Sequence, residues 1–384
     1  MKIALVHLCS FGDCLYATVI ARQIKSDFPA CHLTWVIGDK YASVLEGNPF
    51  VDSIKSFPVL NVQDAISNAW KSARSWTELH LSSGEFKMVF YTQICPDNVH
   101  LYDGLIRSTI YRAFGRQVSP PHRPVLNLGS HEISAVDVWA ARNALHKFKH
   151  IFLFECAPSS GQSPMSPARA MELALELARR HPDAAFCLSS MNSFNSTSPQ
   201  ILDASGLTFR QNLALMRHCT GLLGCSSGLT WLSTSEGAAN LPMLQILTKS
   251  TAPFRFASVA ADFATFGLDD ALVIELAEPA DTMVLDCLGV WISQSHKAAR
   301  ARFHQTLGVN HRHASAIYAS VRGRQGVIPA LRTLIHFVFR NGWSVVPWRL
   351  LISEPPSLLL SMSRRFASWL TGVKRFKKFP AGES

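Results

Sequence analysis

The chain has few charged residues and no long uninterrupted apolar segment. Only 17% of its 384 residues are Asp, Glu, Lys or Arg, whereas 48% are hydrophobic. This composition excludes a largely disordered chain, and the length exceeds what one ordinary α/β domain needs. No stretch reaches the ~18 consecutive apolar residues of a membrane-spanning helix. We therefore expect two globular domains that do not cross a bilayer.

Cysteine and histidine patterns typical of metal sites are also missing. The 9 cysteines are scattered, odd in number and never form a Cys-x-x-Cys pair, so they indicate neither a disulfide framework nor a zinc ribbon. None of the 15 histidines belongs to a His-Glu-x-x-His sequence. We expect no bound metal and no cofactor.

The N-terminal segment lacks the features of a secretory signal. The apolar run at residues 3–6 is short, and a polar turn follows from Ser10. We interpret this segment as a first β-strand and expect a cytoplasmic protein.

The positive charge is confined to the last quarter of the chain. Residues 290–384 hold 15 Lys and Arg against two Glu, a net charge of +13, while residues 1–289 hold 22 against 25 acidic residues, a net charge of −3. A nearly neutral body with a basic tail predicts an anionic surface as the partner of the tail.

Short apolar runs rich in β-branched and aromatic residues alternate with helix-like segments along most of the chain. This alternation is typical of a parallel sheet. The first half predicts strands at 3–8, 32–37 and 87–92 and helices at about 15–26, 41–45 and 104–115. The second half predicts strands at 150–154, 184–188, 221–225 and 243–247 and helices at 133–148, 167–180, 211–219 and 229–236.

Two successive α/β units predict two Rossmann-like domains that face each other across a cleft. We place the first at residues 1–148 and the second at 149–296. A basic helical extension follows at 297–384. Ligands in such folds bind beyond the carboxyl ends of the strands, where the loops of both domains meet.

Arg, aromatic and Leu residues interleave in the extension. We expect residues 297–345 to pack as core. Cations beside Trp and Phe are typical of a segment that lies on an anionic membrane surface, and we expect this role for residues 364–379. No nucleic-acid-binding motif accompanies the charge, so nucleic acid is not an expected partner.

The turn after the first strand carries a carboxylate. Ser10 and Gly12 form a tight turn that places Asp13 at the start of a helix, on the edge that faces the cleft. Asp13 could deprotonate a hydroxyl group there. It could equally cap the helix, which is the commoner role of Asp at such a position.

Two further loops follow strands of the second unit and are rich in Ser and Gly. Such loops let backbone N–H groups approach a diphosphate. Each alone could be a simple capped turn, but two on adjacent strands favour a nucleoside-diphosphate ligand. The candidate binding residues are Ser159, Ser160, Gly161 and Gln162 in one loop and Ser226, Ser227, Gly228 and Thr230 in the other.

These motifs together resemble glycosyltransferase family 9, the bacterial heptosyltransferase-like enzymes of lipopolysaccharide assembly. Residues 10–13 (SFGD) match the Ser-x-Gly-Asp turn of that family. Residues 224–231 (GCSSGLTW) match in part its Gly-x-Asp-[Ser/Thr]-Gly-Leu-x-His motif, and residues 207–221 (LTFRQNLALMRHCTG) resemble the helix that leads into it. The resemblance covers roughly residues 1–280.

The resemblance implies a GT-B fold and an inverting glycosyltransferase. Asp13 would be the catalytic base, acting on a lipopolysaccharide-type or other glycolipid or glycan acceptor. The donor would be a nucleoside diphosphate linked to heptose or a related sugar. The chain lacks Asp-x-Asp, the usual carboxylate pair for a metal-bound sugar nucleotide. Helix N-termini and basic side chains would therefore meet the leaving-group charge, with Arg210, Arg217 and Lys249 as candidates.

The chain departs from the family pattern in the donor half. Ser226 stands where the family has Asp, Trp231 where it has His, and Gln162 and Ser163 where a lysine is usual. Trp231 could stack on a base or sugar, or could simply be a buried residue of a helix face. These differences indicate another donor or a loss of activity. They leave open a non-catalytic nucleotide-binding scaffold at the membrane and a sugar-nucleotide epimerase.

Overall fold

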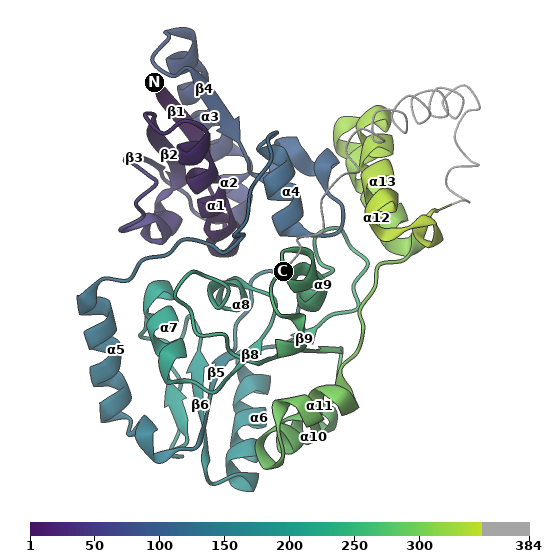
Figure 1. Ribbon diagram of the computed structural model, residues 1–384. Coiled ribbons are helices and arrows are strands. Elements are labelled where there is room, and N and C mark those ends of the chain that lie inside the picture. Colours follow the sequence, from purple (N-terminus) through teal and green to yellow (C-terminus); the bar gives the residue numbers. More distant parts are fainter. Residues whose placement is uncertain (348–384) are drawn as a thin grey trace, which may run out of the picture.

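The chain forms two parallel α/β units, one above the other in Figure 1. The computed structural model describes residues 1–347. The upper sheet has four strands in the order β3-β2-β1-β4 and the lower sheet has six in the order β10-β9-β8-β5-β6-β7. All strand pairs are parallel, as the alternation in the sequence predicts.

The first sheet is built around its N-terminal strand, which pairs with β2 on one side and β4 on the other. Four of the five residues of β1 are buried, because neighbouring strands and helices surround it. Its strands are β1 (Lys2–Val6), β2 (His32–Gly38), β3 (Ser53–Phe57) and β4 (Met88–Tyr91). The helical segments of this half are α1 (Phe11–Asp27), η1 (Asp39–Leu45), α2 (Val62–Ala65), α3 (Asn68–Ser82), η2 (Ile94–Asn98), η3 (Val99–Leu101) and α4 (Ile106–Ala113).

The second sheet has β5 and β8 at its centre and helices on both sides (Figure 1). Its strands are β5 (His150–Glu155), β6 (Ala184–Ser189), β7 (Ile201–Asp203), β8 (Gly221–Gly224), β9 (Met243–Leu247) and β10 (Val273–Ala277). The helical segments are α6 (Pro167–Arg180), α7 (Phe209–Leu215), η5 (Met216–His218), α8 (Gly228–Leu232), α9 (Val259–Thr265), η6 (Asp270–Leu272), α10 (Asp281–Ser293) and α11 (His296–Phe303).

Local sequence explains the start and the packing of α6. Ser166 is the N-cap, with its hydroxyl accepting a hydrogen bond from Arg169 N, and Pro167 occupies the first turn. The buried residues recur at helical spacing and join the core of the second unit: Ala170, Leu173, Ala174, Leu177 and Ala178.

Helix α5 (Ser130–Arg142) and the turn η4 (Leu145–Lys147) connect the two sheets. Helix α5 packs against α7 and runs beside the second sheet (Figure 1). The domain boundaries at residues 148 and 296 stay predictions.

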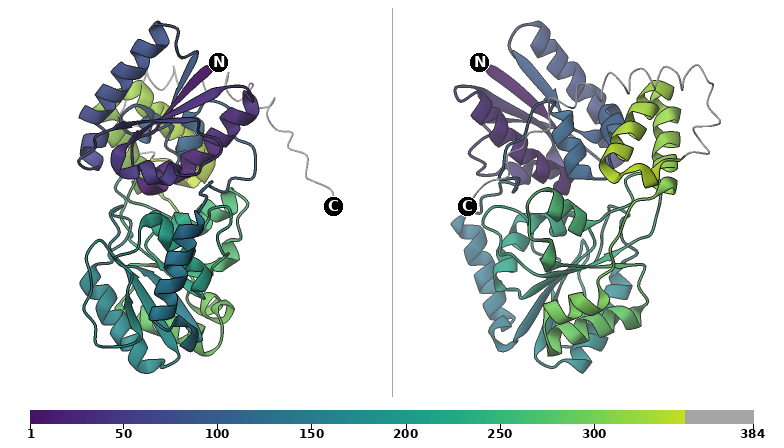
Figure 2. Two further views of the ribbon diagram at one scale, coloured as in Figure 1. Left: turned by 90° about the vertical axis from the view of Figure 1, so that its left-hand side faces the viewer. Right: turned by 45° about the vertical axis from the view of Figure 1, so that its right-hand side comes forward.

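The end of the described chain returns to the first unit. Helices α12 (His311–Gln325) and α13 (Val327–Asn341), followed by η7 (Trp343–Val345), lie beside α4 (Figures 1 and 2). Phe337 and Tyr318 are fully buried in a small core shared with Tyr102. The packing expected for this part of the extension is therefore confirmed for α12 and α13.

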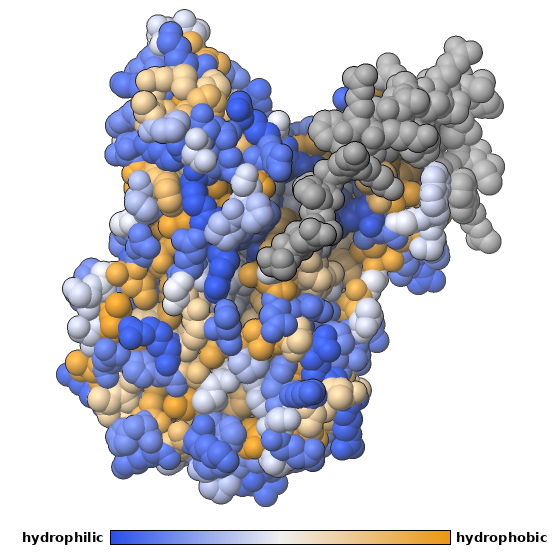
Figure 3. Space-filling model, viewed as in Figure 1, coloured by the Kyte–Doolittle hydropathy of each residue, from blue (hydrophilic) through white to orange (hydrophobic). Residues whose placement is uncertain are grey.

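No helix within residues 1–347 is long and apolar enough to cross a bilayer. On the face shown in Figure 3, hydrophilic and hydrophobic residues are interspersed over both units. Residues 364–379, for which we expect membrane contact, lie outside the described part of the chain.

Candidate functional site

A cleft of about 1050 Å³ lies between the two units, where the loops at the carboxyl ends of their strands meet. The loop after β1 contributes Ser10, Gly12 and Asp13 to one wall. The loops after β5 and β8 contribute the opposite wall, which includes Ser159, Ser160, Gln162, Ser226, Ser227 and Gly228. The structure thus brings most of the residues singled out in the sequence to one place.

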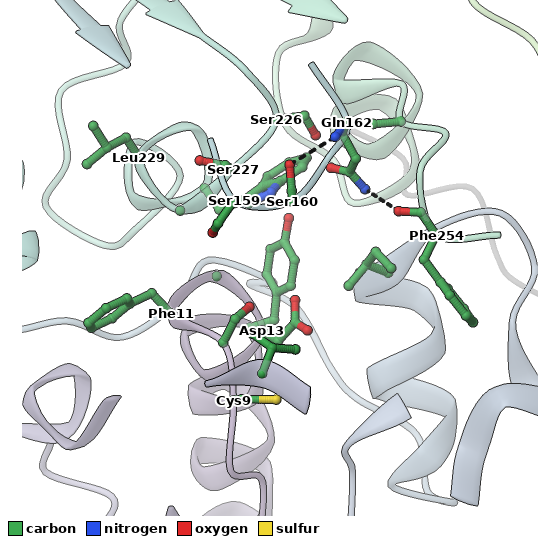
Figure 4. Close-up of a pocket in the computed structure, with 18 of the residues that line it drawn as sticks. Cys9, Phe11, Asp13, Ser159, Ser160, Gln162, Ser226, Ser227, Leu229 and Phe254 are labelled. Atoms are coloured by element: carbon green, nitrogen blue, oxygen red, sulfur yellow. Dashed lines mark hydrogen bonds between the residues drawn. The ribbon is translucent and has the colours of Figure 1, made fainter. Parts of the chain in front are cut away.

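Asp13 is positioned by α1 but does not cap it. Ser10 is the N-cap residue, so Asp13 is the third residue of the helix. Its carboxylate accepts no hydrogen bond from residues 1–347. Figure 4 shows it directed across the cleft toward the serine loops of the second unit. The capping explanation is therefore wrong for this residue.

Burial sets the protonation behaviour of Asp13. Loss of solvent around the carboxyl raises its pKa from 3.8 to about 7, and no cation close enough to lower the pKa lies in the described part of the chain. A carboxyl group with a pKa near the working pH is suited to accept a proton during a reaction.

The raised pKa also predicts how Asp13 affects stability. The folded protein holds the proton more tightly than the unfolded chain, so ionisation of Asp13 removes stability as the pH rises from about 4 to about 7. We expect Asp13→Asn to raise the Tm at about pH 8 and to leave it unchanged at about pH 4. Thermal unfolding at both pH values measures this. A lower Tm at both would mean that the carboxyl supports the fold.

Gly12 lies where the two units touch. A Cβ atom on this residue would come within 3.1 Å of Cδ1 of Trp231, so glycine lets α1 approach α8 closely. The Phe11 ring next to it stacks on Phe209 with centroids 4.6 Å apart. Trp231 also lies 5.3 Å from the Tyr16 ring while lining the cleft, so it serves as packing at the contact between the units.

Gln162 holds the first serine loop in place. Its side-chain Nε2 donates to the Phe254 carbonyl at 3.0 Å (Figure 4). Its backbone carbonyl accepts from Thr248 N at 2.9 Å. Its backbone N donates to the Ser160 hydroxyl at 3.2 Å (Figure 4). The Gln162 side chain and backbone thus join two loops of the cleft wall.

Glu155 was not singled out from the sequence, yet it organises the second serine loop. It is the last residue of β5 and is buried. Its carboxyl accepts hydrogen bonds from Cys225 N at 2.7 Å, from Leu229 N at 3.1 Å and from the hydroxyls of Ser227 and Thr230. Most donors of this loop are therefore already satisfied by a side chain of the protein itself.

Two residues of this loop have different surroundings. The Thr230 hydroxyl is fully buried and donates to Glu155 and Gln245, which places it beneath the cleft wall. Ser226 lines the cleft and is only 1% exposed, but its Oγ has no hydrogen-bond partner within residues 1–347. A buried hydroxyl without a partner at a cleft wall is a position at which a ligand can supply the missing hydrogen bond.

With this geometry established, comparison with solved structures identifies the architecture. A glycosyltransferase of family 9 from Veillonella parvula DSM 2008 matches with a TM-score of 0.51 and 13% identity, over 87% of this chain and 97% of that one. The ADP-heptose lps heptosyltransferase II of E. coli matches with a TM-score of 0.51 and 14% identity, over 77% of this chain and 99% of that one. The protein has a GT-B glycosyltransferase fold. No protein-family model and no curated protein matches the sequence.

The GT-B fold confirms the expected fold class. At 13% and 14% identity the similarity to family 9 and heptosyltransferase structures is one of fold. It supports the resemblance seen in residues 10–13 and 224–231 only at that level.

The cations expected to meet a leaving-group charge do not line the GT-B cleft. Arg210 is buried in a two-point ion pair with Glu132, at 2.6 and 2.7 Å, and also donates to main-chain carbonyls. Arg217 and Lys249 are exposed outside the cleft lining. Within residues 1–347 the cleft is lined instead by Arg255 and Arg324. The expectation that Arg210 meets the leaving-group charge is therefore wrong, because Glu132 already neutralises its guanidinium.

A buried ion pair joins the two halves of the fold beside the cleft. Arg107 of α4 lies 3.0 Å from Asp262 of α9, and both side chains are almost completely shielded from solvent. The guanidinium lies over the rings of Tyr16 and Phe266, at 4.5 and 5.0 Å from their centroids. Burial raises the pKa of Asp262 to about 6, and Arg107 opposes this rise. Sequence reasoning missed this pair because its members are far apart in the chain.

The described residues form no cluster suited to a metal ion. Within residues 1–347, no group of three or more His, Cys, Asp or Glu side chains is arranged to hold one.

Proposed function

We propose that this protein is an inverting glycosyltransferase that uses a nucleoside-diphosphate sugar. The observation that carries the proposal is the placement of Asp13. The Asp13 carboxyl, which does not cap α1 and has a pKa of about 7, faces the Ser159–Ser160 and Ser226–Ser227 pairs across one cleft (Figure 4). Ligands of α/β folds bind beyond the carboxyl ends of the strands and preferentially between domains, which is where this cleft lies.

The geometry supports direct displacement at the anomeric carbon. An acceptor hydroxyl on the Asp13 side would attack that carbon while the bond to the diphosphate oxygen breaks on the opposite face. Asp13 would take the hydroxyl proton, and the nucleoside diphosphate would leave as an anion. Attack from the face opposite the leaving group inverts the anomeric configuration.

The substrate classes follow from the same proposal. The E. coli neighbour is named for ADP-heptose and lipopolysaccharide, and we propose heptose or a related sugar as the donor sugar and a lipopolysaccharide-type or other glycolipid or glycan as the acceptor. A lipid-linked acceptor suits a cytoplasmic protein at the inner face of the membrane. The net charge of +13 over residues 290–384 would favour that location.

A non-catalytic nucleotide-binding scaffold is the second candidate. Glu155 favours it, because this side chain already occupies the amides of Cys225 and Leu229 in the donor loop. A scaffold would bind the nucleotide without turning it over.

Ligand-dependent thermal unfolding tests the proposal. The purified chain is heated with nucleoside diphosphates and a panel of their sugar conjugates. A ligand that binds only the folded state adds ~2.7 kcal/mol of stability at a hundred times its dissociation constant. We expect one base and sugar combination to raise the Tm selectively. A folded sample that responds to none of these ligands would contradict the proposal.

A further inference from the structure

The described part of the cleft lining carries more carboxyl than guanidinium groups, so its cations decide where an anionic ligand can bind. Within residues 1–347 the lining contains three carboxyl groups, those of Asp13, Glu155 and Asp262, and the two guanidinium groups of Arg255 and Arg324. Asp262 is neutralised by Arg107, and Glu155 is surrounded by hydrogen-bond donors. A diphosphate therefore requires a cation that the protein has not already paired.

The second serine loop provides little of that stabilisation. Glu155 accepts from Cys225 N and Leu229 N, and Gln245 accepts from Ser226 N at 2.9 Å. These backbone groups cannot donate to a phosphate while they hold the loop together. The first serine loop, which lies on the same wall, therefore has to provide more of the charge stabilisation.

Arg255 lies directly over that first loop. It follows β9 in the chain, and its Nη1 is 3.4 Å from the Ser160 carbonyl, too long for a strong hydrogen bond. The side chain is exposed, and no carboxylate within the described residues pairs with it. Its charge is available to a ligand in the cleft.

Gly161 makes the position of Arg255 possible. A Cβ atom on Gly161 would lie 1.2 Å from Arg255 Nη1, so any side chain would displace the guanidinium. Gly161 also has a φ of +67°, which other residues adopt only with strain. The absence of a side chain at Gly161 thus allows the Arg255 guanidinium to pack against the backbone of this loop.

Arg324 occupies a different part of the cleft. It comes from the end of α12 and lies beside the Cys95 thiol of the first unit, where it opposes the burial that raises the pKa of that thiol. The two cations are therefore separable by mutation.

We propose that Arg255, which packs against Gly161, binds the diphosphate of the donor nucleotide. The proposal rests on the proposed function and assigns to Arg255 the charge recognition that the sequence placed on Arg210, Arg217 or Lys249. Ser226, whose buried hydroxyl has no partner in the described part of the chain, lies on the same wall and can add a neutral hydrogen bond to the same ligand.

Binding measurements on the full chain test this assignment. Calorimetric titrations use inorganic pyrophosphate, ADP, UDP and GDP, and the matching nucleosides. Arg255→Gln is expected to weaken binding of the diphosphates by about tenfold or more and to leave nucleoside binding unchanged, because only the diphosphates carry the charge. Arg255→Lys should restore part of the loss. Arg217→Gln changes an exposed arginine outside the cleft lining and is the matched control that should retain diphosphate affinity.

Gly161→Ala gives an independent test of the geometry. It keeps Arg255 but places a methyl group at the position of the guanidinium. It should therefore reproduce the loss of diphosphate affinity expected for Arg255→Gln. Unchanged nucleoside affinity shows that each variant has kept its folded cleft. Wild-type diphosphate affinity in Arg255→Gln would overturn this inference alone. Failure of the wild-type chain to bind any of the diphosphates would overturn both it and the proposed function.

Discussion

Asp13→Asn is expected to lower kcat by about 10²- to 10⁴-fold while the dissociation constant of the donor stays near its wild-type value. The amide has nearly the same shape as the carboxyl but cannot accept the acceptor hydroxyl proton. Donor binding depends on the opposite wall, so it should not change. Steady-state kinetics and calorimetric titration of the donor measure the two quantities separately.

The pH dependence and a matched control complete this test. In the wild type, kcat/KM should fall as the pH drops below about 7, because protonated Asp13 cannot act as a base. Asp281→Asn changes an exposed Asp in the first turn of α10, outside the cleft lining, and should retain wild-type kcat. Full turnover in Asp13→Asn would exclude Asp13 as the base. Loss of donor binding in this variant would show that it acts in binding.

Arg107→Met is expected to lower the free energy of unfolding by about 3–5 kcal/mol. It would remove the partner of a carboxyl that is buried between α4 and α9, and it would leave the rings of Tyr16 and Phe266 without the cation that lies over them. Urea unfolding at neutral pH measures the loss. The reason for so large an effect is that the remaining Asp262 is buried and loses its contacting cation, while Arg340 acts on it only from a greater distance.

Two further variants show whether the loss of stability comes from the unpaired buried carboxyl of Asp262 or from removing any paired arginine. Arg116→Met removes an ion pair with Asp27 whose arginine is 47% exposed, and its cost should be about 0–1 kcal/mol. Combining Arg107→Met with Asp262→Leu should recover part of the loss, since no unpaired carboxyl remains. A cost below about 1 kcal/mol for Arg107→Met alone would show that the pair does not hold the two units together.

The regular elements were predictable where local signals were strong. The helix expected at 167–180 and the strand expected at 243–247 match α6 and β9. A Ser-Pro start marks the helix, and a run that is apolar except for the uncharged Gln245 marks the strand. Strand β3 was missed because its residues, SIKSF, are largely exposed at the sheet edge and lack a hydrophobic pattern. Strand β10 was also missed, and it contains Glu275 within an otherwise apolar run.

The candidate site was predictable in position but not in its internal contacts. The order of parallel strands places Asp13 and the serine loops at one cleft, which the sequence pattern anticipates. The bonds of Glu155 and the pairing of Arg210 with Glu132 depend on residues at least 70 positions apart in the chain. No local pattern contains that information. Arg255 could have been noticed as the cation in a loop that follows a buried strand.

Analysis of the reaction product tests the central claim most directly. The purified chain is incubated with the sugar nucleotide that stabilises it and with a glycolipid acceptor, and the new glycosidic linkage is examined by NMR. We expect release of the nucleoside diphosphate together with a linkage of inverted anomeric configuration, and we expect neither with Asp13→Asn. A product of retained configuration, or binding of the sugar nucleotide without transfer to any acceptor, would contradict the assignment as an inverting glycosyltransferase.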